Sequence, residues 1–422
     1  MTGEEAVALI HQRSWVGCKP GLDRTRELLS RLGNPQDELK FVHITGTNGK
    51  GSTASIVASV LRAAGYRTGL FTSPHLYRFN ERMQVDDTFI TDGQLVALTQ
   101  RVLAAAEGMA EQPTEFELMT AIGLCYFQQE RCDIAVLEVG LGGRLDSTNV
   151  IPVPEAAVIT NIGLEHTQQL GNTHALIAAE KAGIIKENGR AVLYGQREDV
   201  ENVVRGVCAE KGASLTITDE TALEVLSSTP EGQTFRYRGR GPYRLALLGT
   251  YQLKNAITAL DTIETLRARG WVISEAAIAQ GLAQARWPGR LELARRTPDF
   301  IIDGGHNPQC AQALTEALRG LYGDKKLIFL VGVLADKDWH TMLSLALPMA
   351  KAFVTMTPPS YRALDSQVLS GWLHEQGAQA EAAESVADGV ARALSLASED
   401  DVICAWGSLY STGEVRHCLG LC

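Results

Sequence analysis

The stretch KFVHITGTNGKGST, residues 40–53, constrains the fold of this chain more than any other. Its first residues are mostly apolar or β-branched and predict a buried strand over 40–45, and residues 50–64 show the spacing of a helix. Three glycines fill the turn between them: Gly46, Gly49 and Gly51. A strand that passes through a glycine-rich turn into a helix is typical of α/β layers built on a mainly parallel sheet.

The same alternation continues along the 422 residues. Further strands are expected at 66–72, 133–139, 156–162 and 191–195, with a helix at 174–187, and the segment 200–247 is expected to be a less regular, β-rich edge. After the turn WPGR the pattern restarts, with strands at 299–303, 326–333, 352–356 and 401–406 and helices at 309–322, 338–350 and 386–398. This predicts an α/β domain over residues 1–287 with a central, mostly parallel sheet, and a smaller Rossmann-like α/β domain over 288–422.

Charge and composition exclude several classes of protein. A net charge of −10 without a long basic stretch argues against bulk nucleic-acid binding. No apolar run approaches the roughly 18 residues of a membrane span, and the N-terminus is acidic where a signal peptide is basic. The eight cysteines form no CxxC pair, so most are expected to be free and buried. We therefore expect a cytoplasmic protein with neither a membrane nor a nucleic-acid partner.

The glycine-rich turn is a candidate phosphate site. The backbone N–H groups of such a turn, with the N-terminus of the following helix, bind anions. Lys50 can reach terminal phosphates, and the hydroxyl of Ser52 or Thr53 can bind phosphate or Mg²⁺. The common nucleotide loop has glycine six residues before its lysine and Ser or Thr directly after it, whereas this chain has Ile44 and Gly51 there. A tight turn with a solvated lysine is the alternative, and three glycines among Thr, Asn and Lys argue against it.

This variant loop resembles the ATP loop of the Mur ligase superfamily, and in particular that of the folylpolyglutamate synthase and dihydrofolate synthase family. The resemblance extends, in order, over nearly the whole chain. Its motifs are TSPHLYRFNERM (72–83), EVGLGGRLDSTNV (138–150), ITNIGLEH (159–166), EKAGIIK (180–186), PGR (288–290), DGGHNP (303–308) and WGSLY (406–410). The resemblance implies a Mur-ligase-like ATPase domain followed by the smaller C-terminal domain, and an ATP-dependent ligase.

The resemblance also implies which residues bind ATP. The triphosphate is expected on Gly46, Thr47, Asn48, Gly49, Lys50, Gly51, Ser52 and Thr53. Asn255 is expected near the adenine, Arg290 on phosphate and Asp303 on ribose. The expected catalytic residues are Lys50, His166, Lys181 and His306, the last near the terminal phosphate. Tyr251 stands where the family commonly has histidine, and no role is assigned to it.

Three residues at strand ends are candidates for Mg²⁺. Glu138 ends the buried run DIAVLE, where an ionised carboxylate is costly without a cation partner. His166 follows another apolar strand, at the end where ligands collect in open α/β sheets, although a lone histidine there is more often structural. Ser73 could equally cap a helix. The resemblance places all three on Mg²⁺, and implies that Lys181 is carbamylated by CO₂ to support the metal; the residues alone do not distinguish Lys181 from Lys186.

The resemblance implies a pteroyl pocket formed by two segments. They supply Leu145, Asp146 and Ser147 of GLGGRLDSTN, and Thr114, Glu115, Phe116 and Glu117 of PTEFE. The ring of Phe116 could stack on a flat heterocycle. An ordinary polar turn explains the first segment as well, and core packing alone is the better explanation of Phe116. The segment CKPGLDR, residues 18–24, resembles the family's pterin-contacting loop but departs from its usual form, LGLER.

The implied reaction uses ATP to activate a carboxylate. The carboxylate of a pteroyl substrate attacks the γ-phosphate, the amine of L-glutamate attacks the acyl phosphate, and phosphate leaves. Dihydropteroate and folates that already carry glutamate are both candidate acids, and we expect a bifunctional, monomeric enzyme whose domains close to exclude water. The alternatives are a monofunctional folylpolyglutamate synthase, another Mur-type amide ligase, a binding protein without catalysis, or a phosphotransferase or nucleotide switch built on the same loop.

Overall fold

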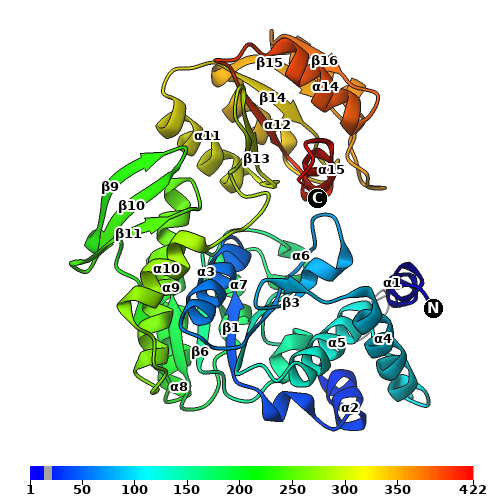
Figure 1. Ribbon diagram of the computed structural model, residues 1–422, viewed down its shortest axis with the longest axis vertical. Coiled ribbons are helices and arrows are strands. Elements are labelled where there is room, and N and C mark those ends of the chain that lie inside the picture. Colours follow the sequence, from blue (N-terminus) through cyan, green and yellow to red (C-terminus); the bar gives the residue numbers. More distant parts are fainter. Residues whose placement is uncertain (14–20, 422) are drawn as a thin grey trace. The chain divides into compact units, whose positions relative to one another are not determined.

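The computed structural model describes residues 1–13 and 21–421, and it contains two α/β units (Figure 1). The first unit comprises Met1–Glu224, Arg236–Tyr243 and Lys254–Ala285, and the second comprises Val225–Phe235, Arg244–Leu253 and Arg286–Cys422. Residues 18–20 of the expected pterin-contacting segment lie outside the described part of the chain. The α/β fold with mostly parallel sheets, expected from the sequence, is confirmed.

An eight-stranded sheet forms the centre of the first unit. Its strands lie in the order β4 (Thr88–Phe89), β3 (Met83–Val85), β2 (Thr68–Phe71), β5 (Ile134–Glu138), β1 (Phe41–Thr45), β6 (Ala156–Ile159), β7 (Arg190–Leu193) and β8 (Ser214–Ile217). The strands from β2 to β8 in this order pair in parallel, whereas β3 and β4 pair antiparallel at one edge. All residues of β1 are buried, as is typical of a central strand in a parallel sheet, and they include the polar His43 and Thr45. Because β1 lies between β5 and β6 and runs parallel to both, the chain that leaves its carboxyl end starts beside the carboxyl ends of these two strands.

Helices pack around this sheet (Figure 1). They are α1 (Gly3–His11), α2 (Asp23–Arg31), α3 (Lys50–Ala63), α4 (Asp92–Ala106), α5 (Glu115–Gln129), α6 (Thr167–Leu170), α7 (His174–Ala182), α8 (Glu198–Glu210), α9 (Thr250–Arg267) and α10 (Glu275–Gln284). Helix α3 packs on β1, β2 and β5, and α10 packs on α3. The close approach requires Gly281, because a Cβ there would lie 2.5 Å from Cα of Val60. Helix α3 is thus held between the sheet and α10, which fixes its N-terminus.

A six-stranded sheet forms the centre of the second unit. Its strands lie in the order β12 (Glu292–Arg295), β13 (Asp299–Ile302), β17 (Val402–Trp406), β14 (Leu327–Val331), β15 (Ala350–Thr355) and β16 (Ala380–Ala382), and all pairs except β12 with β13 are parallel. The helices are α11 (Pro308–Tyr322), α12 (Trp339–Ala346), α13 (Ser366–Glu375), α14 (Val386–Leu396) and α15 (Leu409–Cys418). Phe329 and Phe353 stack in its core with ring centroids 5.5 Å apart.

The segment 200–247 is only partly the β-rich edge that we expected. Strand β8 does form an edge of the large sheet, and β9 (Leu223–Thr229), β10 (Gly232–Tyr237) and β11 (Arg240–Leu245) form a separate three-stranded sheet. The first part of the segment instead belongs to α8. Val200, Val204 and Cys208 of α8 are buried at every fourth position, so a helical spacing was present that the prediction missed.

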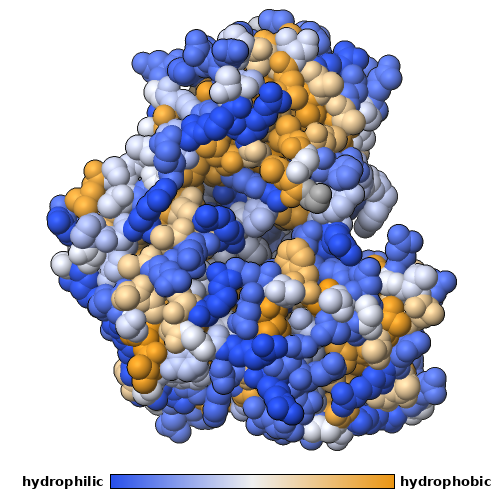
Figure 2. All heavy atoms as spheres, in the orientation of Figure 1, coloured by the Kyte–Doolittle hydropathy of each residue, from blue (hydrophilic) through white to orange (hydrophobic). Residues whose placement is uncertain are grey.

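One further expectation concerns the surface of the protein and membrane-spanning helices. Polar residues cover most of the face drawn in Figure 2, with apolar patches between them. No helix within residues 1–13 and 21–421 is both long and apolar enough to cross a bilayer.

The six described cysteines are free, and four of them are buried, namely Cys125, Cys132, Cys208 and Cys404. For these six the prediction of mostly free, buried thiols is confirmed.

Candidate active site

The turn between β1 and α3 is held by the chain that follows β6. The backbone N–H of Thr47 donates to the carbonyl oxygen of Asn161 at 2.7 Å, and the hydroxyl of Thr47 donates to that of Gly163 at 3.1 Å. The hydroxyl of Thr160 donates to the carbonyl oxygen of Asn48 at 2.8 Å. Because β6 neighbours β1 in the sheet, two adjacent strand ends fix the shape of this loop.

Two of its glycines are required by the geometry. Gly46 has a φ of +153°, and a Cβ there would lie 1.8 Å from the hydroxyl oxygen of Thr160. Gly49 has a φ of +88°, and a Cβ there would lie 2.5 Å from Oδ1 of Asn255. Gly49 is the N-cap of α3, so the first N–H groups of this helix have no partner within the helix. The N-terminus of α3 therefore presents the positive end of a helix dipole, which fits an anion such as a triphosphate.

Two lysines converge on the carbonyl oxygen of Gly46. Nζ of Lys50 donates to it at 3.1 Å, and Nζ of Lys181, from α7, donates to it at 2.7 Å. Lys181 is buried, and this burial, together with the charge of Lys50, lowers the pKa of Lys181 from its usual 10.5 to about 7. A large share of Lys181 is therefore the neutral amine near neutral pH, which is the form that reacts with CO₂.

The structure separates Lys181 from Lys186, which the sequence could not do. Nζ of Lys186 donates to the carbonyl oxygen of Asn149 at 2.8 Å, in the loop that follows β5. Burial lowers the pKa of Lys186 to about 8, less than that of Lys181. Of the two amines, Lys181 is the one bonded to the glycine-rich loop 46–53, the candidate phosphate loop.

Ser73, just beyond the end of β2, lies beside Glu138, the last residue of β5. The backbone N–H of Ser73 donates to Oε2 of Glu138 at 3.1 Å, and Glu138 is only 4% exposed. A carboxylate and a serine hydroxyl are hard oxygen donors of the kind that Mg²⁺ prefers, and these two residues are neighbours through the backbone of Ser73. His166 is exposed at the N-cap of α6, with a φ of +52° that is uncommon outside glycine. Across the described residues no three His, Cys, Asp or Glu side chains form a metal cluster.

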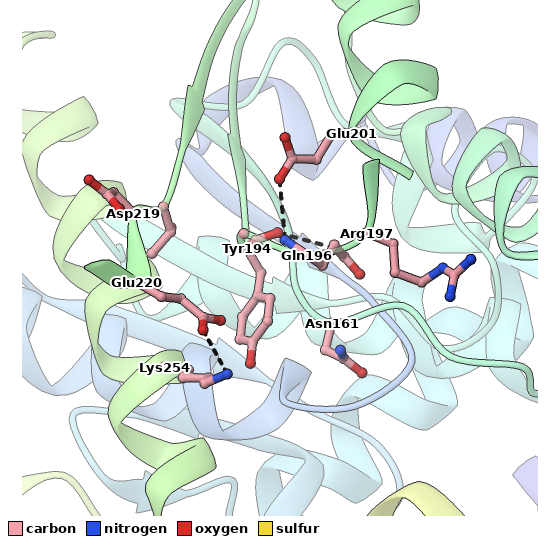
Figure 3. A pocket seen from close by; sticks show the side chains of 10 residues that line it. Asn161, Tyr194, Gln196, Arg197, Glu201, Asp219, Glu220 and Lys254 are labelled. Carbon is pink, nitrogen blue, oxygen red and sulfur yellow. Dashed lines mark hydrogen bonds and ion pairs between the residues drawn. The ribbon is translucent and has the colours of Figure 1, made fainter. Parts of the chain in front are cut away.

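A pocket of about 460 Å³ opens at the carboxyl ends of β6, β7 and β8 (Figure 3). Lys254 and Glu220 form an ion pair of 2.7 Å at its wall. Tyr194, Gln196 and Asn161 also line it. The same Asn161 holds the phosphate loop through its carbonyl oxygen, so this pocket and the loop share a wall.

Comparison with known proteins decides the family. Residues 44–263 match the Mur ligase middle domain, and residues 289–409 match the domain described as Mur ligase, glutamate ligase domain. The chain is 36% identical over 431 residues to the folylpolyglutamate synthase of Lacticaseibacillus casei, and the match covers 99% of each chain. The chain belongs to the folylpolyglutamate and dihydrofolate synthase family.

Further relatives and solved structures support the same family assignment. The dihydrofolate synthase/folylpolyglutamate synthase of Bacillus subtilis is 37% identical over 351 residues, covering 81% of each chain. The structure of Mycobacterium tuberculosis folylpolyglutamate synthase complexed with ADP is similar with a TM-score of 0.90 at 32% identity, covering 99% of both chains. A structure of the Escherichia coli relative with DHPP and ADP has a TM-score of 0.88 at 28% identity, covering 100% of this chain and 98% of that one. As a member of this family the chain is an ATP-dependent ligase that adds glutamate to an acid.

In this family member the loop 140–149 is tied to β1 and to α7. The hydroxyl of Thr45 donates to the carbonyl oxygen of Gly142 at 2.6 Å, and the N–H of Arg144 donates to that of Glu180 at 3.0 Å. Among the expected pteroyl residues, Asp146 and Ser147 are buried whereas Leu145 is 49% exposed. Of these three side chains, that of Leu145 is therefore the most accessible to a substrate.

Thr114 and Glu117 of PTEFE are bonded within the protein. Thr114 caps α5, its hydroxyl accepts from the N–H of Glu117, and its own N–H donates back to that carboxylate at 2.7 Å. The guanidinium of Arg24 also donates to Glu117, from Nη2 at 3.0 Å. The sequence analysis included Arg24 in the segment 18–24 but did not pair it with Glu117, although Thr-x-x-Glu at 114–117 is a recognisable capping box that signals an internal role for Glu117.

The other two residues of PTEFE differ from each other. Oε1 of Glu115 lies 2.9 Å from Nδ1 of His11, from α1. Phe116 is half-buried and faces the loop, because a Cβ at Gly140 would lie 2.5 Å from its Cζ. Its ring also makes an edge contact with Phe71 at 6.1 Å. Phe116 therefore lies between the core and the loop.

The second unit holds Asp303 in a fixed orientation. Oδ2 of Asp303 accepts from the N–H of Leu291 at 2.8 Å, and Oδ1 accepts from the N–H of Gly305 at 2.7 Å. Tyr251, for which the sequence suggested no role, donates its hydroxyl to Oδ2 of Asp303 at 3.3 Å. Burial, aided by the charge of Asp303, raises the pKa of Tyr251 well above 10, so the phenol keeps its proton. Tyr251 thus takes part in orienting Asp303.

Arg290 and His306 lie beside Gly304, next to Asp303 in the chain. A Cβ at Gly304 would lie 2.6 Å from Nη1 of Arg290. Nδ1 of His306 lies 2.9 Å from the carbonyl oxygen of Gly304 and must carry the hydrogen, because a carbonyl only accepts. Nε2 of His306 is then the nitrogen directed away from this carbonyl. In the first unit, the buried Asn255 packs against Gly49 of the phosphate loop.

We expect Tyr251→Phe to raise KM for ATP about two- to tenfold with kcat nearly unchanged, because one hydrogen bond is lost to Asp303, the residue expected on the ribose of ATP. Tyr322→Phe is the matched control, since its hydroxyl donates to Oδ2 of Asp299 at 3.0 Å in the same unit but not at these residues. Steady-state kinetics with varied ATP measure both variants. Equal KM values for ATP in the two variants would remove Tyr251 from the nucleotide site.

Proposed function

We propose that this chain adds L-glutamate to pteroyl acids and accepts both dihydropteroate and folates that already carry glutamate. The observation that carries the proposal is the group of Lys50 and Lys181 on one loop carbonyl at the carboxyl end of the large sheet. The names of relatives support both acids, because those of Bacillus subtilis and Escherichia coli are dihydrofolate synthase/folylpolyglutamate synthases. Structures of relatives with folate and with DHPP support a pteroyl ligand.

ATP is the phosphoryl donor in this proposal. Residues 46–53 bind its triphosphate, and Asn255 lies near its adenine. Arg290 and His306 act on phosphate and Asp303 on ribose, as residues of a C-terminal domain over 288–422 that follows an ATPase domain over 1–287. Complexes of relatives with ADP and AMPPCP support nucleotide binding in the family.

Ser73, Glu138 and His166 would hold Mg²⁺, which neutralises charge on phosphate oxygens when it is bound. We also propose that Lys181 is carbamylated. Its burial and its pKa of about 7 support this, because CO₂ adds to a neutral amine. A carbamate would replace a buried cation beside Lys50 by an anion, and so relieve the repulsion between the two lysines.

The residues of the chain act by positioning and by charge. Lys50 and the N-terminus of α3 bind the γ-phosphate while the substrate carboxylate attacks it, and ADP leaves. The amine of glutamate then attacks the acyl carbon of the acyl phosphate, and phosphate leaves with one oxygen of the former carboxylate. Lys50, Arg290 and His306 offset the negative charge that develops. Phe116, Leu145, Asp146 and Ser147 form the pteroyl pocket, with Thr114, Glu115 and Glu117 at the start of α5.

The choice of acid is tested by offering the substrates separately. Purified protein is given ATP, Mg²⁺ and labelled glutamate with either dihydropteroate or monoglutamyl tetrahydrofolate. Labelled product from both acids is expected. Product from the folate alone would establish the monofunctional synthase instead, and product from neither would overturn the proposal. A phosphotransferase or nucleotide switch would form ADP at the same rate without glutamate.

We further propose that the protein is a cytoplasmic monomer. Its free cysteines support the first part, because disulfides are rare in the cytosol. Light scattering of the purified chain tests the second, and a mass near 45.6 kDa is expected.

A further inference from the structure

Two polar side chains of the central strand β1 have no role in the reaction described above. His43 and Thr45 are two residues apart, so they lie on the same face of the strand, and both are fully buried. Thr45 donates to the carbonyl oxygen of Gly142 at 2.6 Å, and Nε2 of His43 lies 2.8 Å from the hydroxyl oxygen of Thr148. Both side chains therefore reach from the centre of the sheet to the loop 140–149.

The contact of His43 continues to a predicted substrate residue. The hydroxyl of Thr148 donates to Oδ1 of Asp146 at 2.5 Å. A hydroxyl has one hydrogen, so Nε2 of His43 must be the donor in its contact with Thr148. Burial, aided by the charge of Lys186, lowers the pKa of His43 to about 3, which keeps the ring neutral. The order of donation is thus from His43 to Thr148 and from Thr148 to Asp146.

This arrangement fixes the backbone of the loop. Oδ1 of Asp146 also accepts from the N–H of Thr148 at 3.0 Å, and Oδ2 accepts from the N–H of Leu141 at 2.9 Å. Both carboxylate oxygens therefore tie parts of the loop together, while the neighbouring Leu145 is 49% exposed. The orientation of Leu145 toward a substrate depends on these bonds.

The histidine has a free-energy cost that an apolar residue would avoid. Nδ1 of His43 is buried and, in the part of the chain that the structure describes, has no hydrogen-bond partner. A buried polar atom without a partner is unfavourable, and a side chain of this kind in a central strand calls for a functional explanation. The hydrogen bond from His43 to Thr148, which helps to hold the loop 140–149, is such an explanation.

We propose that His43 is a positioning residue for the pteroyl substrate, which acts through Thr148 and Asp146 on the loop 140–149. The inference rests on the proposed function, because it takes this loop as the pteroyl site. The hydrogen bonds of the His43 side chain lead to the loop 140–149 through Thr148, so we expect the main effect of its loss on binding of the acid.

The variant Thr148→Val tests this, because it keeps the shape of the side chain and removes the hydroxyl. We expect KM for the pteroyl acid to rise about tenfold and KM for ATP to stay within about twofold. Thr148→Ser keeps the hydroxyl and should restore most of the lost affinity. Thr262→Val is the matched control: Thr262 is equally buried, in α9, and its hydroxyl donates to the carbonyl oxygen of Thr258 at 2.8 Å.

A second variant, His43→Leu, removes the donor at the other end of the chain of bonds. The double variant His43→Leu/Thr148→Val should show little more than either single change, because both break the same connection. Thermal unfolding of each protein separates loss of fold from loss of affinity. If His43→Leu does not fold, the comparison of Thr148→Val with Thr262→Val still tests the positioning role.

The results that would overturn the positioning role differ from the result that would overturn the proposed function. A KM for the pteroyl acid that is equal in Thr148→Val and Thr262→Val, or a KM for ATP that rises as much, would overturn the positioning role. A wild-type protein that forms no product from any pteroyl acid would overturn the proposed function, and this role with it, before any variant is made.

Discussion

Replacing Lys181 by alanine is expected to lower kcat by about a thousandfold, because it removes the amine on which the proposed carbamate would form, and with it the support that this carbamate would give to Mg²⁺. The contact of Lys181 with the carbonyl oxygen of Gly46 is lost as well. Acetate or another short carboxylic acid should occupy the space and partly restore kcat. Glutamate-dependent product formation, measured with and without added acetate, tests both parts.

Lys186→Ala is the matched control for Lys181→Ala. The two lysines are in one motif, but Lys186 is bonded to Asn149 in the loop. Its loss should raise KM for the pteroyl acid, and acetate should not reverse the effect. Full activity in Lys181→Ala, or equal rescue of both variants, would contradict the carbamate assignment.

The pKa of Lys181 also predicts a dependence on pH. Below a pH of about 7 the folded protein holds the ammonium form, which does not react with CO₂. At low bicarbonate, activity should therefore rise as the pH increases through 7. In the uncarbamylated protein the unfolded chain keeps this proton up to about pH 10.5 and the folded chain releases it near 7, so the free energy of unfolding should rise with pH between these values.

The change Glu138→Gln is expected to lower kcat/KM by about a thousandfold and to raise the Mg²⁺ concentration needed for half-maximal activity. Glutamine keeps an acceptor for the N–H of Ser73, which Glu138 binds at 3.1 Å, but it lacks the negative charge that a divalent cation requires. The fold should persist. Titration of activity with Mg²⁺ measures the change in Mg²⁺ requirement, and a thermal unfolding curve shows whether the fold persists.

Glu155→Gln is the control for Glu138→Gln. Glu155 is also buried, but it precedes β6 at the opposite end of the sheet, where Nε1 of Trp271 donates to it at 3.2 Å and Arg269 pairs with it. Its substitution should lower the free energy of unfolding by about 2 kcal/mol and leave kcat unchanged. An unchanged rate in Glu138→Gln would remove Glu138 from the metal site.

The sequence predicted those parts of the fold that depend on local pattern. Buried parallel strands such as β1 and β5 are rich in apolar and β-branched residues, and Gly46 and Gly49 mark a turn that only glycine fits. The helical spacing of Val200 and Cys208 was equally local and was overlooked.

The remaining site contacts join residues that are distant in the chain. His43 and Thr148 are 105 residues apart, and Arg24 and Glu117 are 93 apart. No periodic pattern connects such pairs, because each depends on how strands and loops are arranged in the folded sheet. The same holds for Lys181 and Lys186, whose different partners follow from packing and not from the helical pattern around them.

The central claim is that ATP activates the carboxylate of a pteroyl acid for attack by glutamate. It is tested most directly with an acid whose carboxylate carries ¹⁸O, incubated with the protein, ATP, Mg²⁺ and glutamate. We predict that each product molecule is accompanied by one ADP and by one phosphate that contains a single ¹⁸O from the acid. Phosphate without ¹⁸O, or ADP formed at the same rate in the absence of glutamate, would contradict the account.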